Sequence, residues 1–460
     1  MHIIPSLRFK VQYTFCSIFL RFLKVFLEKY MKFHCFTLGC KVNQYETQAM
    51  EQQLVALGNT LAPEAESDVL IVNTCTVTAV ADRKNRTLIH RLRREHPDAV
   101  LGVCGCYAQV STDAVREMGV DVISGSGGRE EFVQLLLQAC AQQERKPLVC
   151  VDDALRRRTY EVLPAGGLSE RTRAMLKVQD GCSNFCTYCI IPYARGPVRS
   201  MPLGEAVVQV KALAEAGYRE IVVTGIEIAS WGWDFKDGSR FVELAEALCL
   251  AAPTLRFRLG SLEPRVVDED FCKRLSALPN LCPQFHLSLQ SGSDTVLKRM
   301  HRKYDTARYY ESVCLLKKYF PDCAVTTDLI VGFPGETEAE LEESLSFAEK
   351  CGFAAMHIFP YSRRAGTPAD TMPDQIPKAV KTERAARAGQ TAARLRERYD
   401  RALLGTVQEV LFEQPEGEFF TGHAPNGVKV CVREPMEQNT LRRVRIEALL
   451  PDAVLAHPLP

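Results

Sequence analysis

Residues 180–190, Asp-Gly-Cys-Ser-Asn-Phe-Cys-Thr-Tyr-Cys-Ile, place Cys182, Cys186 and Cys189 in the spacing C-x3-C-x2-C. Three thiolates on one short loop can bind three irons of a 4Fe–4S cluster and leave the fourth iron without a protein ligand. A structural zinc ion needs four ligands, and no fourth Cys or His lies nearby in the sequence. The open iron is a position at which a second molecule can bind.

The cysteine loop directly follows a strand-like run, and five more such runs come after it, separated by helix-length segments. The six runs are residues 174–178, 220–224, 255–259, 284–289, 324–331 and 354–359. This alternation predicts βαβ units and a parallel sheet, either in a partial barrel or in a doubly wound sheet. In both architectures a ligand binds at the carboxyl ends of the strands.

Small and polar residues stand at the ends of these runs. Gly225 and Glu227 follow the second run, Glu263 follows the third and Gln290 the fourth. A glycine allows a ligand to approach the backbone closely. Each position alone is more often a turn than a site, but together they predict one rim of cofactor contacts around the cysteine loop.

The amino-terminal part of the chain predicts a second parallel sheet. Strand-like runs at 33–38, 69–73, 100–103 and 120–124 alternate with helix-length segments at 47–57, 81–95 and 107–118. Cys40, Cys75 and Cys106 each follow one of these runs, so a parallel sheet would bring them to one edge, where they could bind a second cluster. Cys104 competes with Cys106, because strand alternation puts both on the same face. Residues 146–170 are interpreted as a linker.

The carboxy-terminal part predicts a long helix and a small β-barrel. Residues 378–401 carry eight Lys or Arg against three Asp or Glu. Such a charge run is either a solvated helix face or an RNA contact. Short β-type runs at 407–412, 427–432 and 442–446 then suggest a small β-barrel.

The composition describes an ordinary folded protein with many thiols. The 460 residues carry a net charge of +1, which excludes a global basic field, and 18 cysteines, too few for a disulfide scaffold. We expect a cytoplasmic protein with reduced thiols and no membrane span. Residues 1–30 contain no signal-peptide cleavage site and are expected to be an upstream extension outside the mature protein. The alternative is a basic amphipathic helix at a membrane surface.

The loop that carries Cys182, Cys186 and Cys189 resembles the radical S-adenosylmethionine (SAM) superfamily, including Tyr188 before the last cysteine. The resemblance implies a partial (β/α)6 barrel and catalytic, cluster-binding roles for the three cysteines. It implies that the amine and carboxylate of SAM bind the open iron, and that an electron then releases a 5′-deoxyadenosyl radical. Tyr188 is expected to contact the cofactor; the alternative is that it packs beneath the loop.

Six stretches resemble the methylthiotransferase family, and the similarity covers nearly the whole chain from Met31. They are TLGCKVNQYE (37–46), VNTCTV (72–77), GCYAQ (105–109), LSLQSG (287–292), LIVGFPGET (329–337) and IFPYSRRAGTP (358–368). The resemblance implies that Cys40, Cys75 and Cys106, not Cys104, bind a second 4Fe–4S cluster. The implied α/β organisation is a parallel-sheet domain (31–145), a radical SAM core (171–375), a connecting helix (376–402) and a TRAM-like RNA-binding barrel (403–460).

The stretch Cys-Lys-Val-Asn (40–43) favours the branch of the family that acts on threonylcarbamoyladenosine. The implied reaction converts N6-threonylcarbamoyladenosine, next to the tRNA anticodon, to its 2-methylthio derivative. The implied partners are the anticodon loop, a reducing donor such as a flavodoxin or ferredoxin, and a sulfur source that the sequence does not identify; a monomer is expected. The alternatives are sibling enzymes acting on isopentenyladenosine or on a ribosomal-protein aspartate, and, in a different class, an iron–sulfur RNA-binding or electron-transfer protein.

Four positions depart from the family pattern. Relatives often carry His or Asn at the position of Glu227 and Pro at that of Ser288. His423 and Gly427 stand where aromatic residues are usual, which puts base stacking at these positions in doubt.

Overall fold

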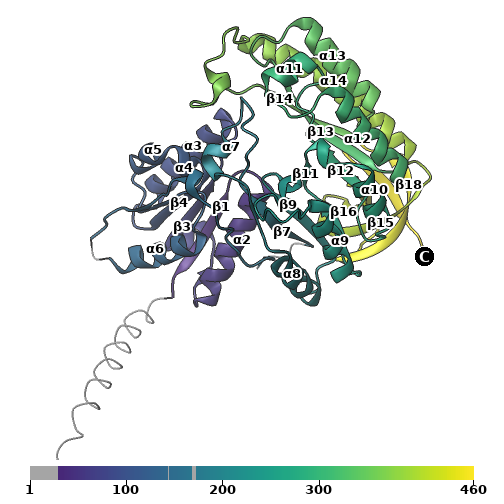
Figure 1. The fold of residues 1–460 in the computed structure, drawn as a ribbon. Coiled ribbons are helices and arrows are strands. Elements are labelled where there is room, and N and C mark those ends of the chain that lie inside the picture. Colours follow the sequence, from purple (N-terminus) through teal and green to yellow (C-terminus); the bar gives the residue numbers. More distant parts are fainter. Residues whose placement is uncertain (1–29, 143, 168–171) are drawn as a thin grey trace, which may run out of the picture.

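A computed structural model describes residues 30–142, 144–167 and 172–460 (Figure 1). Residues 1–29, which make up nearly all of the proposed upstream extension, lie outside this range. The chain forms an amino-terminal sheet domain, a central barrel-like domain and a carboxy-terminal β-barrel. Among the described helices, none combines the length and the hydrophobicity that a membrane crossing requires.

The amino-terminal domain is the predicted parallel sheet, with six strands in the order β2-β1-β3-β4-β5-β6. The strands are β1 (Lys32–Thr37), β2 (Thr60–Leu61), β3 (Val69–Thr74), β4 (Val100–Gly105), β5 (Val122–Ser124) and β6 (Leu148–Cys150). The connecting helices are α2 (Lys41–Ala56), α3 (Ala79–Glu95), α4 (Cys106–Val110), α5 (Thr112–Arg116) and α6 (Arg129–Ala141), with a 3-10 turn at Glu64–Glu66. Helices cover both faces, so β3 and β4 are buried along their whole length.

Strand β6 lies inside the segment 146–170 that the sequence suggests as a linker. It pairs in parallel with β5, Val122 opposite Leu148 and Ser124 opposite Cys150. Three residues are too short to stand out as a strand in the sequence, and pairing with an existing sheet edge stabilises them. The segment therefore contributes a strand before it continues to the central domain.

The central domain contains the six predicted strands in a partial barrel, split between two four-stranded sheets, β10-β9-β7-β8 and β11-β12-β13-β14. The strands are β7 (Arg173–Asp180), β8 (Arg199–Ser200), β9 (Glu220–Gly225), β10 (Arg256–Leu259), β11 (Ser261–Leu262), β12 (Gln284–Leu287), β13 (Ala324–Val331) and β14 (Ala355–Pro360). Only β8, which the sequence does not predict, runs antiparallel to its neighbour. The helices are α7 (Ile191–Arg195), α8 (Leu203–Glu215), α9 (Phe241–Ala251), α10 (Glu269–Ser276), α11 (Asp294–Arg299), α12 (Thr306–Tyr319) and α13 (Glu338–Cys351), with 3-10 turns at Ile228–Ser230 and Pro264–Val266.

Strand β13 shows how the barrel separates its core from its interior cavity. Val325 and Leu329 belong to the large hydrophobic cluster formed with the outer helices. The residues between them, Thr326 and Asp328, line a cavity on the concave side of the sheet. Successive side chains of a strand point to opposite faces, so this alternation gives the barrel an apolar outside and a polar inside.

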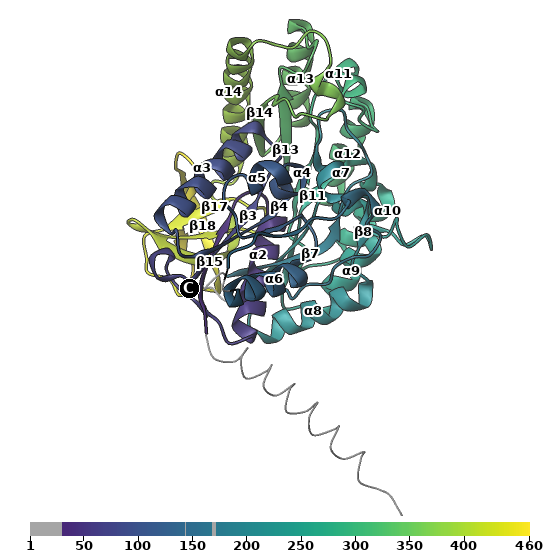
Figure 2. The ribbon, with the colours of Figure 1, turned by 90° about the vertical axis from the view of Figure 1, so that its left-hand side faces the viewer.

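Helix α14 (Lys378–Ala402) confirms the predicted long helix and runs beside α13 and β14 (Figures 1 and 2). Its arginines are largely paired with carboxylates: Arg384 with Glu336 (2.8 Å), and Arg394 with Glu349 (3.2 Å). Arg387 pairs with acidic residues of the same neighbouring helix. The acidic α13, Glu336 before it and the acidic residues of α14 itself together compensate most of the local charge, which favours the solvated helix face over an RNA contact.

The carboxy-terminal domain is a closed five-stranded barrel in the order β15-β16-β17-β19-β18. Its strands are β15 (Val407–Glu416), β16 (Phe419–His423), β17 (Lys429–Val432), β18 (Thr440–Leu449) and β19 (Val454–Pro458). Alternate valines of these strands fill the interior. Closure leaves no unpaired edge, which stabilises so small a domain.

This barrel docks on the central domain through a buried cluster of charges. Glu220, fully buried at the start of β9, accepts hydrogen bonds from Arg256 (2.6 Å) and Arg258 (2.8 Å). Arg256 also donates to the carbonyl oxygen of Glu409 (3.0 Å), and Arg258 to that of Pro425 (2.9 Å). The turn between β16 and β17 therefore packs on the central domain.

The two departures in the barrel belong to this docked region. His423 pairs with Glu413 (2.8 Å), and its carbonyl oxygen accepts from Arg256 (3.2 Å). A Cβ at Gly427 would lie 2.8 Å from the side chain of Gln284. Both positions serve domain docking in this chain, which accounts for the missing aromatic residues.

We expect Glu220→Gln to reduce the free energy of unfolding at pH 7 by about 3 kcal/mol. Burial acts in the opposite direction, but the guanidinium groups of Arg258 and Arg256 lower the pKa of Glu220 to about 2. A carboxylate with a lowered pKa stabilises the fold above its unfolded pKa of about 4.5, and this stabilisation is lost as the pH falls toward 2. Urea unfolding of cluster-free protein should therefore show a gap between wild type and variant that narrows below pH 4.5.

The matched control is Glu66→Gln, which removes an exposed pair with Lys32. Exposed pairs contribute little, so this variant should unfold like the wild type. A gap for Glu220→Gln that stays constant with pH would contradict the assigned ionisation.

Candidate functional site

The first set of cysteines, the loop set (Cys182, Cys186 and Cys189), lies on the loop that leaves β7 at the carboxyl end of the barrel. Gly181 turns the chain there with φ +73°, and a Cβ at this position would lie 1.9 Å from the carbonyl oxygen of Pro197. Only glycine fits so close an approach. The Cys182 amide then donates to the carbonyl oxygen of Gly196 (3.0 Å), which fixes the start of the loop.

The thiols of the loop set are electrostatic neighbours of one another. Burial is the main cause that raises the pKa of Cys182 to about 12, and Glu227 together with the other two cysteines adds to it. Burial and Cys186 raise the pKa of Cys189 to about 12. Iron binds thiolates, so loading this loop must displace protons and is favoured by rising pH.

Arg302 contacts the loop set. It donates from Nη1 to Cys186 Sγ (3.2 Å) and from Nε to the hydroxyl of Tyr304 (3.0 Å), and it lies 4.8 Å from the centre of the Tyr304 ring. A charged donor stabilises a thiolate, and hydrogen bonds to ligand sulfur tune the reduction potential of a cluster. The sequence analysis did not find Arg302, because it lies 116 residues from Cys186.

The predicted rim begins with two glutamates next to the loop set. Glu227 Oε1 is buried without a hydrogen-bond partner among the described residues. Burial and the nearby Glu263 raise the pKa of Glu227 to about 7. Glu263 itself accepts from Arg265 Nε (2.9 Å). An orphaned buried acceptor is suited to a donor group of a ligand, such as a hydroxyl or ammonium group of SAM.

The other predicted cofactor contacts have packing roles in the structure. A Cβ at Gly225 would lie 2.9 Å from the carbonyl oxygen of Gln179. Gln290 has φ +67° and joins β12 to β13 through backbone hydrogen bonds. Tyr188 packs edge-on against Phe333, with ring centroids 6.5 Å apart. Contact of these residues with SAM remains a prediction.

The second set, the edge set (Cys40, Cys75 and Cys106), comes together at one edge of the amino-terminal sheet. Cys40 precedes α2, Cys75 follows β3 and Cys106 begins α4. Burial raises the pKa of Cys75 to about 12, and the neighbouring Cys106 and Cys40 contribute. Gly39 has φ +117°, and a Cβ there would lie 2.6 Å from that of Cys75, so a glycine allows the two loops to meet.

Asn43, the last residue of the Cys-Lys-Val-Asn stretch, ties the loops of the edge set together. Its buried Nδ2 donates to the carbonyl oxygens of Leu38 (3.1 Å) and Thr74 (2.9 Å). Its own carbonyl oxygen accepts from Asn73 Nδ2 (3.0 Å). These bonds satisfy backbone groups at the ends of β1 and β3, and they explain why an asparagine stands here.

The structure separates the two competing cysteines, Cys104 in β4 and Cys106 at the start of α4. Cys106 Sγ accepts a hydrogen bond from Arg195 Nε (3.2 Å) on the side of the edge set, and Cys40 is an electrostatic neighbour of Cys106. Cys104 is fully buried in the hydrophobic cluster of the amino-terminal sheet, close to Arg129. The geometry favours Cys106 as the third ligand.

A buried network of charges joins the two sets. Arg195, at the end of the helix that follows the loop set, pairs with Glu46 and lies 3.5 Å from Asp180, which precedes Cys182. Lys177 is 3.2 Å from both carboxylates. All four side chains are buried, and the pKa of Glu46 is lowered to about 2 because Arg195 and Lys177 outweigh its burial. The network fixes the amino-terminal domain against the cluster loop.

Sulfur spacing distinguishes a cluster from a single ion. Among the described residues, no three cysteine sulfurs lie within 4.8 Å of one another. A tetrahedral zinc ion with Zn–S bonds of about 2.3 Å needs sulfurs about 3.8 Å apart. Neither set has the sulfur spacing of a single zinc ion, and each offers three thiolates, the number that binds three irons of a 4Fe–4S cluster.

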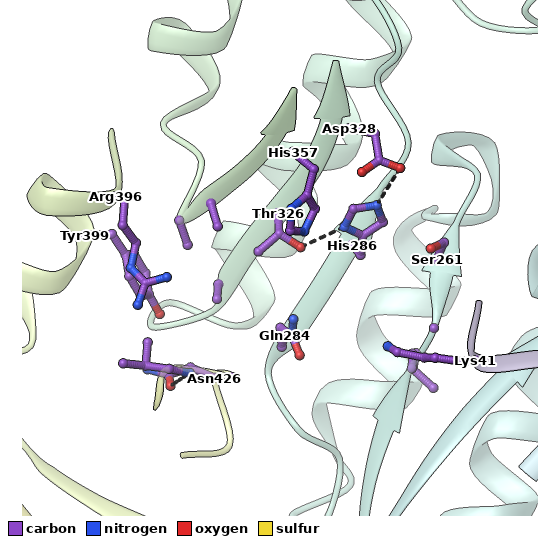
Figure 3. A pocket seen from close by; sticks show the side chains of 17 residues that line it. Lys41, Ser261, Gln284, His286, Thr326, Asp328, His357, Arg396, Tyr399 and Asn426 are labelled. Carbon is purple, nitrogen blue, oxygen red and sulfur yellow. Dashed lines mark hydrogen bonds and ion pairs between the residues drawn. The ribbon is translucent and has the colours of Figure 1, made fainter. Parts of the chain in front are cut away.

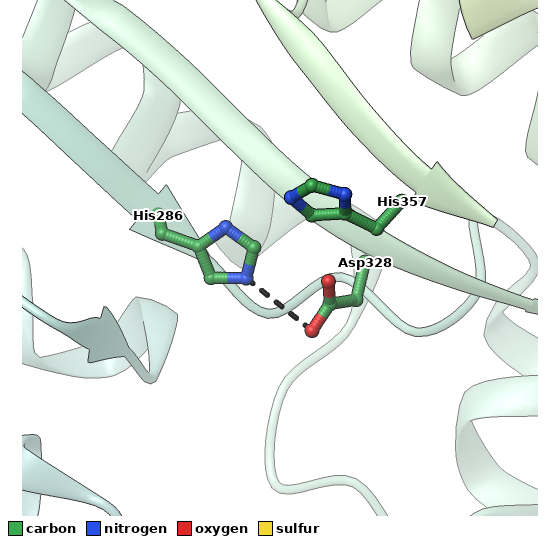
Figure 4. A group of neighbouring side chains, drawn as sticks. All are labelled: His286, Asp328 and His357. Carbon is green, nitrogen blue, oxygen red and sulfur yellow. Dashed lines mark ion pairs between the residues drawn. The ribbon is translucent and has the colours of Figure 1, made fainter. Parts of the chain in front are cut away.

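A polar cavity of about 430 Å³ lies inside the partial barrel, below the strand ends (Figure 3). Its walls come from β12, β13 and β14, and it is bordered by α14, the β16–β17 turn and Lys41 of the amino-terminal domain. His286, Asp328 and His357 face one another there, with ligand atoms within 4.8 Å (Figure 4). The sequence analysis did not identify this cavity.

Comparison with known proteins matches two segments of the chain to described families. Residues 176–348 match the radical SAM superfamily, and residues 32–125 match the uncharacterized protein family UPF0004. The chain is 41% identical over 404 residues to the threonylcarbamoyladenosine tRNA methylthiotransferase MtaB of Bacillus subtilis, covering 86% of this chain and 89% of that one. It is 38% identical to the protein of the same name from Thermotoga maritima, over 82% and 85%.

A second group of relatives carries another substrate in its name. The chain is 34% identical to the tRNA-2-methylthio-N(6)-dimethylallyladenosine synthase of Acetivibrio thermocellus, over 85% of this chain and 83% of that one. Among solved structures, the methyltransferase TsrM of Kitasatospora setae, determined with cobalamin and a 4Fe–4S cluster, has a TM-score of 0.54 at 16% identity, covering 74% and 77%. That similarity is one of fold.

Proposed function

The chain belongs to the methylthiotransferase family of radical SAM enzymes, and on this premise we propose that it converts N6-threonylcarbamoyladenosine in tRNA to its 2-methylthio derivative. Membership in an enzyme family sets aside the alternative of a non-catalytic electron-transfer protein. The observation that carries the proposal is that two sets of three cysteines, on different domains, are joined by Arg195 and its partners.

Each residue set has a role in the proposal. Cys182, Cys186 and Cys189 would hold the cluster that binds SAM, and Cys40, Cys75 and Cys106 would hold the auxiliary cluster. When bound, these groups supply the electron, the radical that removes the C2 hydrogen of adenine, the sulfur and the methyl group. Arg302 and Arg195 stabilise one thiolate in each set. The network between the sets is itself buried and holds the two domains together.

The proposed substrate is a base in single-stranded loop RNA, since an unpaired base can leave the stack and enter the barrel. The proposed reaction needs a low-potential electron donor such as a flavodoxin or ferredoxin. The proposed setting is the cytoplasm, where tRNA is modified. The carboxy-terminal barrel is consistent with a TRAM domain and is the proposed RNA-binding part, through surfaces other than the turn docked on the central domain.

We expect a strain without this protein to lose 2-methylthio-N6-threonylcarbamoyladenosine from its tRNA and to accumulate the unmethylthiolated nucleoside. Mass spectrometry of digested tRNA measures both. The reconstituted enzyme should restore the modification on anticodon stem–loop RNA that contains N6-threonylcarbamoyladenosine. If the strain instead lost the methylthio group from the dimethylallyladenosine of its tRNA, the substrate would be that of the sibling enzymes and the proposal would be overturned.

A further inference from the structure

The cavity inside the barrel is polar on the sides where its walls are strands. Inward-facing positions of β12, β13 and β14 carry Gln284, His286, Thr326, Asp328 and His357. Figure 3 shows these side chains turned toward one common space. A volume of about 430 Å³ is in the range of small-molecule sites, and its lining includes Ser261, two residues before Glu263 of the predicted rim.

His286 contacts two side chains of β13 through its two ring nitrogens. His286 Nε2 lies 3.3 Å from Asp328, and His286 Nδ1 lies 3.0 Å from the hydroxyl of Thr326. Both ring nitrogens of His286 are thus engaged within the protein. A metal ion would need a lone pair that these contacts occupy. These contacts hold the wall in place, and His357, which lies beside the pair (Figure 4), also lines the cavity.

Two polar side chains that line the cavity have polar atoms left to contact a ligand. Gln284 accepts from Arg258 through Oε1 (2.6 Å), which leaves its amide NH2 for the cavity. Lys41 enters from the amino-terminal domain, on the side opposite Arg396 and Tyr399 (Figure 3). Within the described part of the chain, no carboxylate lies within 4 Å of the Lys41 amine, whereas Arg396 is paired with Asp400 (2.5 Å). Lys41 is therefore a cation without an anionic partner.

The two substrate classes named by the relatives differ in the chemistry of the group on N6 of adenine. The threonylcarbamoyl group carries a carboxylate, a hydroxyl and a urea, whereas the dimethylallyl group is a hydrocarbon. A hydrocarbon placed against Lys41, Gln284 and His357 would leave their polar atoms desolvated and unpaired, which is costly. A carboxylate supplies the anion that Lys41 lacks.

We propose that this cavity is the subsite for the threonylcarbamoyl group, in which Lys41 binds the carboxylate while Gln284 and His357 contact its other polar atoms. The inference rests on the proposed function and specifies which residues select that substrate. Lys41 follows Cys40 directly, so recognition of the N6 group is joined to the edge set through one turn of α2.

Lys41→Gln tests the proposal, because it keeps a polar side chain of similar length and removes the charge. We expect kcat/KM for stem–loop RNA carrying N6-threonylcarbamoyladenosine to fall by roughly 10- to 100-fold. On the same RNA with the threonyl carboxylate converted to its methyl ester, wild type and variant should differ by less than about threefold. Lys41→Arg should retain most of the activity on the acid.

Three measurements keep the outcomes distinct. Iron and sulfide content should be unchanged in Lys41→Gln, which excludes damage to Cys40. His357→Gln, on strand β14, should also lower kcat/KM more for the acid than for the ester. Lys211→Gln, on the outer helix α8, should match the wild type.

Failure of this inference and failure of the proposed function give different results. If the wild type converts the acid RNA but Lys41→Gln lowers kcat/KM equally for acid and ester, or for neither, the subsite assignment is overturned while the function stands. If the wild type leaves the acid RNA unmodified and converts dimethylallyl RNA, the proposed function is wrong, and the subsite falls with it.

Discussion

Cys75→Ala is expected to leave the formation of 5′-deoxyadenosine within about twofold of the wild type and to lower methylthiolated RNA by at least roughly 100-fold. Cys75 belongs to the edge set, and its nearest thiols are Cys106 and Cys40. In the described part of the chain, no hydrogen bond or ion pair joins Cys75 to the loop set, so SAM cleavage should survive its loss. Anaerobic assays with dithionite and synthetic stem–loop RNA measure both products in one reaction, and iron content should fall by about half.

Two further variants give this prediction its controls. Cys186→Ala removes a ligand of the loop set and should abolish both 5′-deoxyadenosine and methylthio product. Cys104→Ala removes an equally buried thiol two residues from Cys106, and it should keep both products because Cys104 packs in the hydrophobic cluster. Methylthio product from Cys75→Ala, or its loss from Cys104→Ala, would show that the edge set is wrongly assigned.

The fold could be predicted where burial on both faces of a sheet leaves apolar runs in the sequence. Three of the four amino-terminal strands and the six central strands stand out for this reason, and β5, only three residues long, lies inside the predicted run 120–124. The unpredicted strands β2, β6, β8 and β11 are only two or three residues long and depend on pairing. The start of α2 at Lys41, six residues before the predicted helix, was missed. Asn43 and Glu46 on its first two turns are polar but buried, which hides the helical period from a hydrophobic pattern.

The cysteines of both sets could be found because short spacing and strand ends are local features of a sequence. Their partners could not, because they come from distant parts of the chain. Arg195 lies 89 residues from Cys106, and Lys41 meets the barrel cavity only when two domains pack together. A count of charges in one segment also omits their partners elsewhere in the chain. Helix α14 does carry the basic run, but a carboxylate that pairs with Arg387 lies on α13.

Arg195→Met is expected to lower the free energy of unfolding by about 3–5 kcal/mol, because it leaves buried carboxylates without their main partner. Arg195 is completely buried, and it pairs with Glu46 and lies 3.5 Å from Asp180. Methionine fills much of the same volume, so the loss of stability reflects the missing charge and its hydrogen bonds and not an empty space. Urea unfolding followed by tryptophan fluorescence measures it.

The same substitution should also shift the auxiliary cluster to a more negative reduction potential. Arg195 Nε donates to Cys106 Sγ (3.2 Å), and such a bond stabilises the reduced, more negative cluster. A redox titration by electron paramagnetic resonance in a Cys186→Ala background observes this cluster alone. Arg199→Met is the matched control: Arg199 is buried and lies 3.4 Å from Asp180, but its hydrogen bonds go to backbone carbonyls of the loop and not to Cys106. Equal shifts in both variants would mean that the potential depends on net charge and not on the hydrogen bond to Cys106.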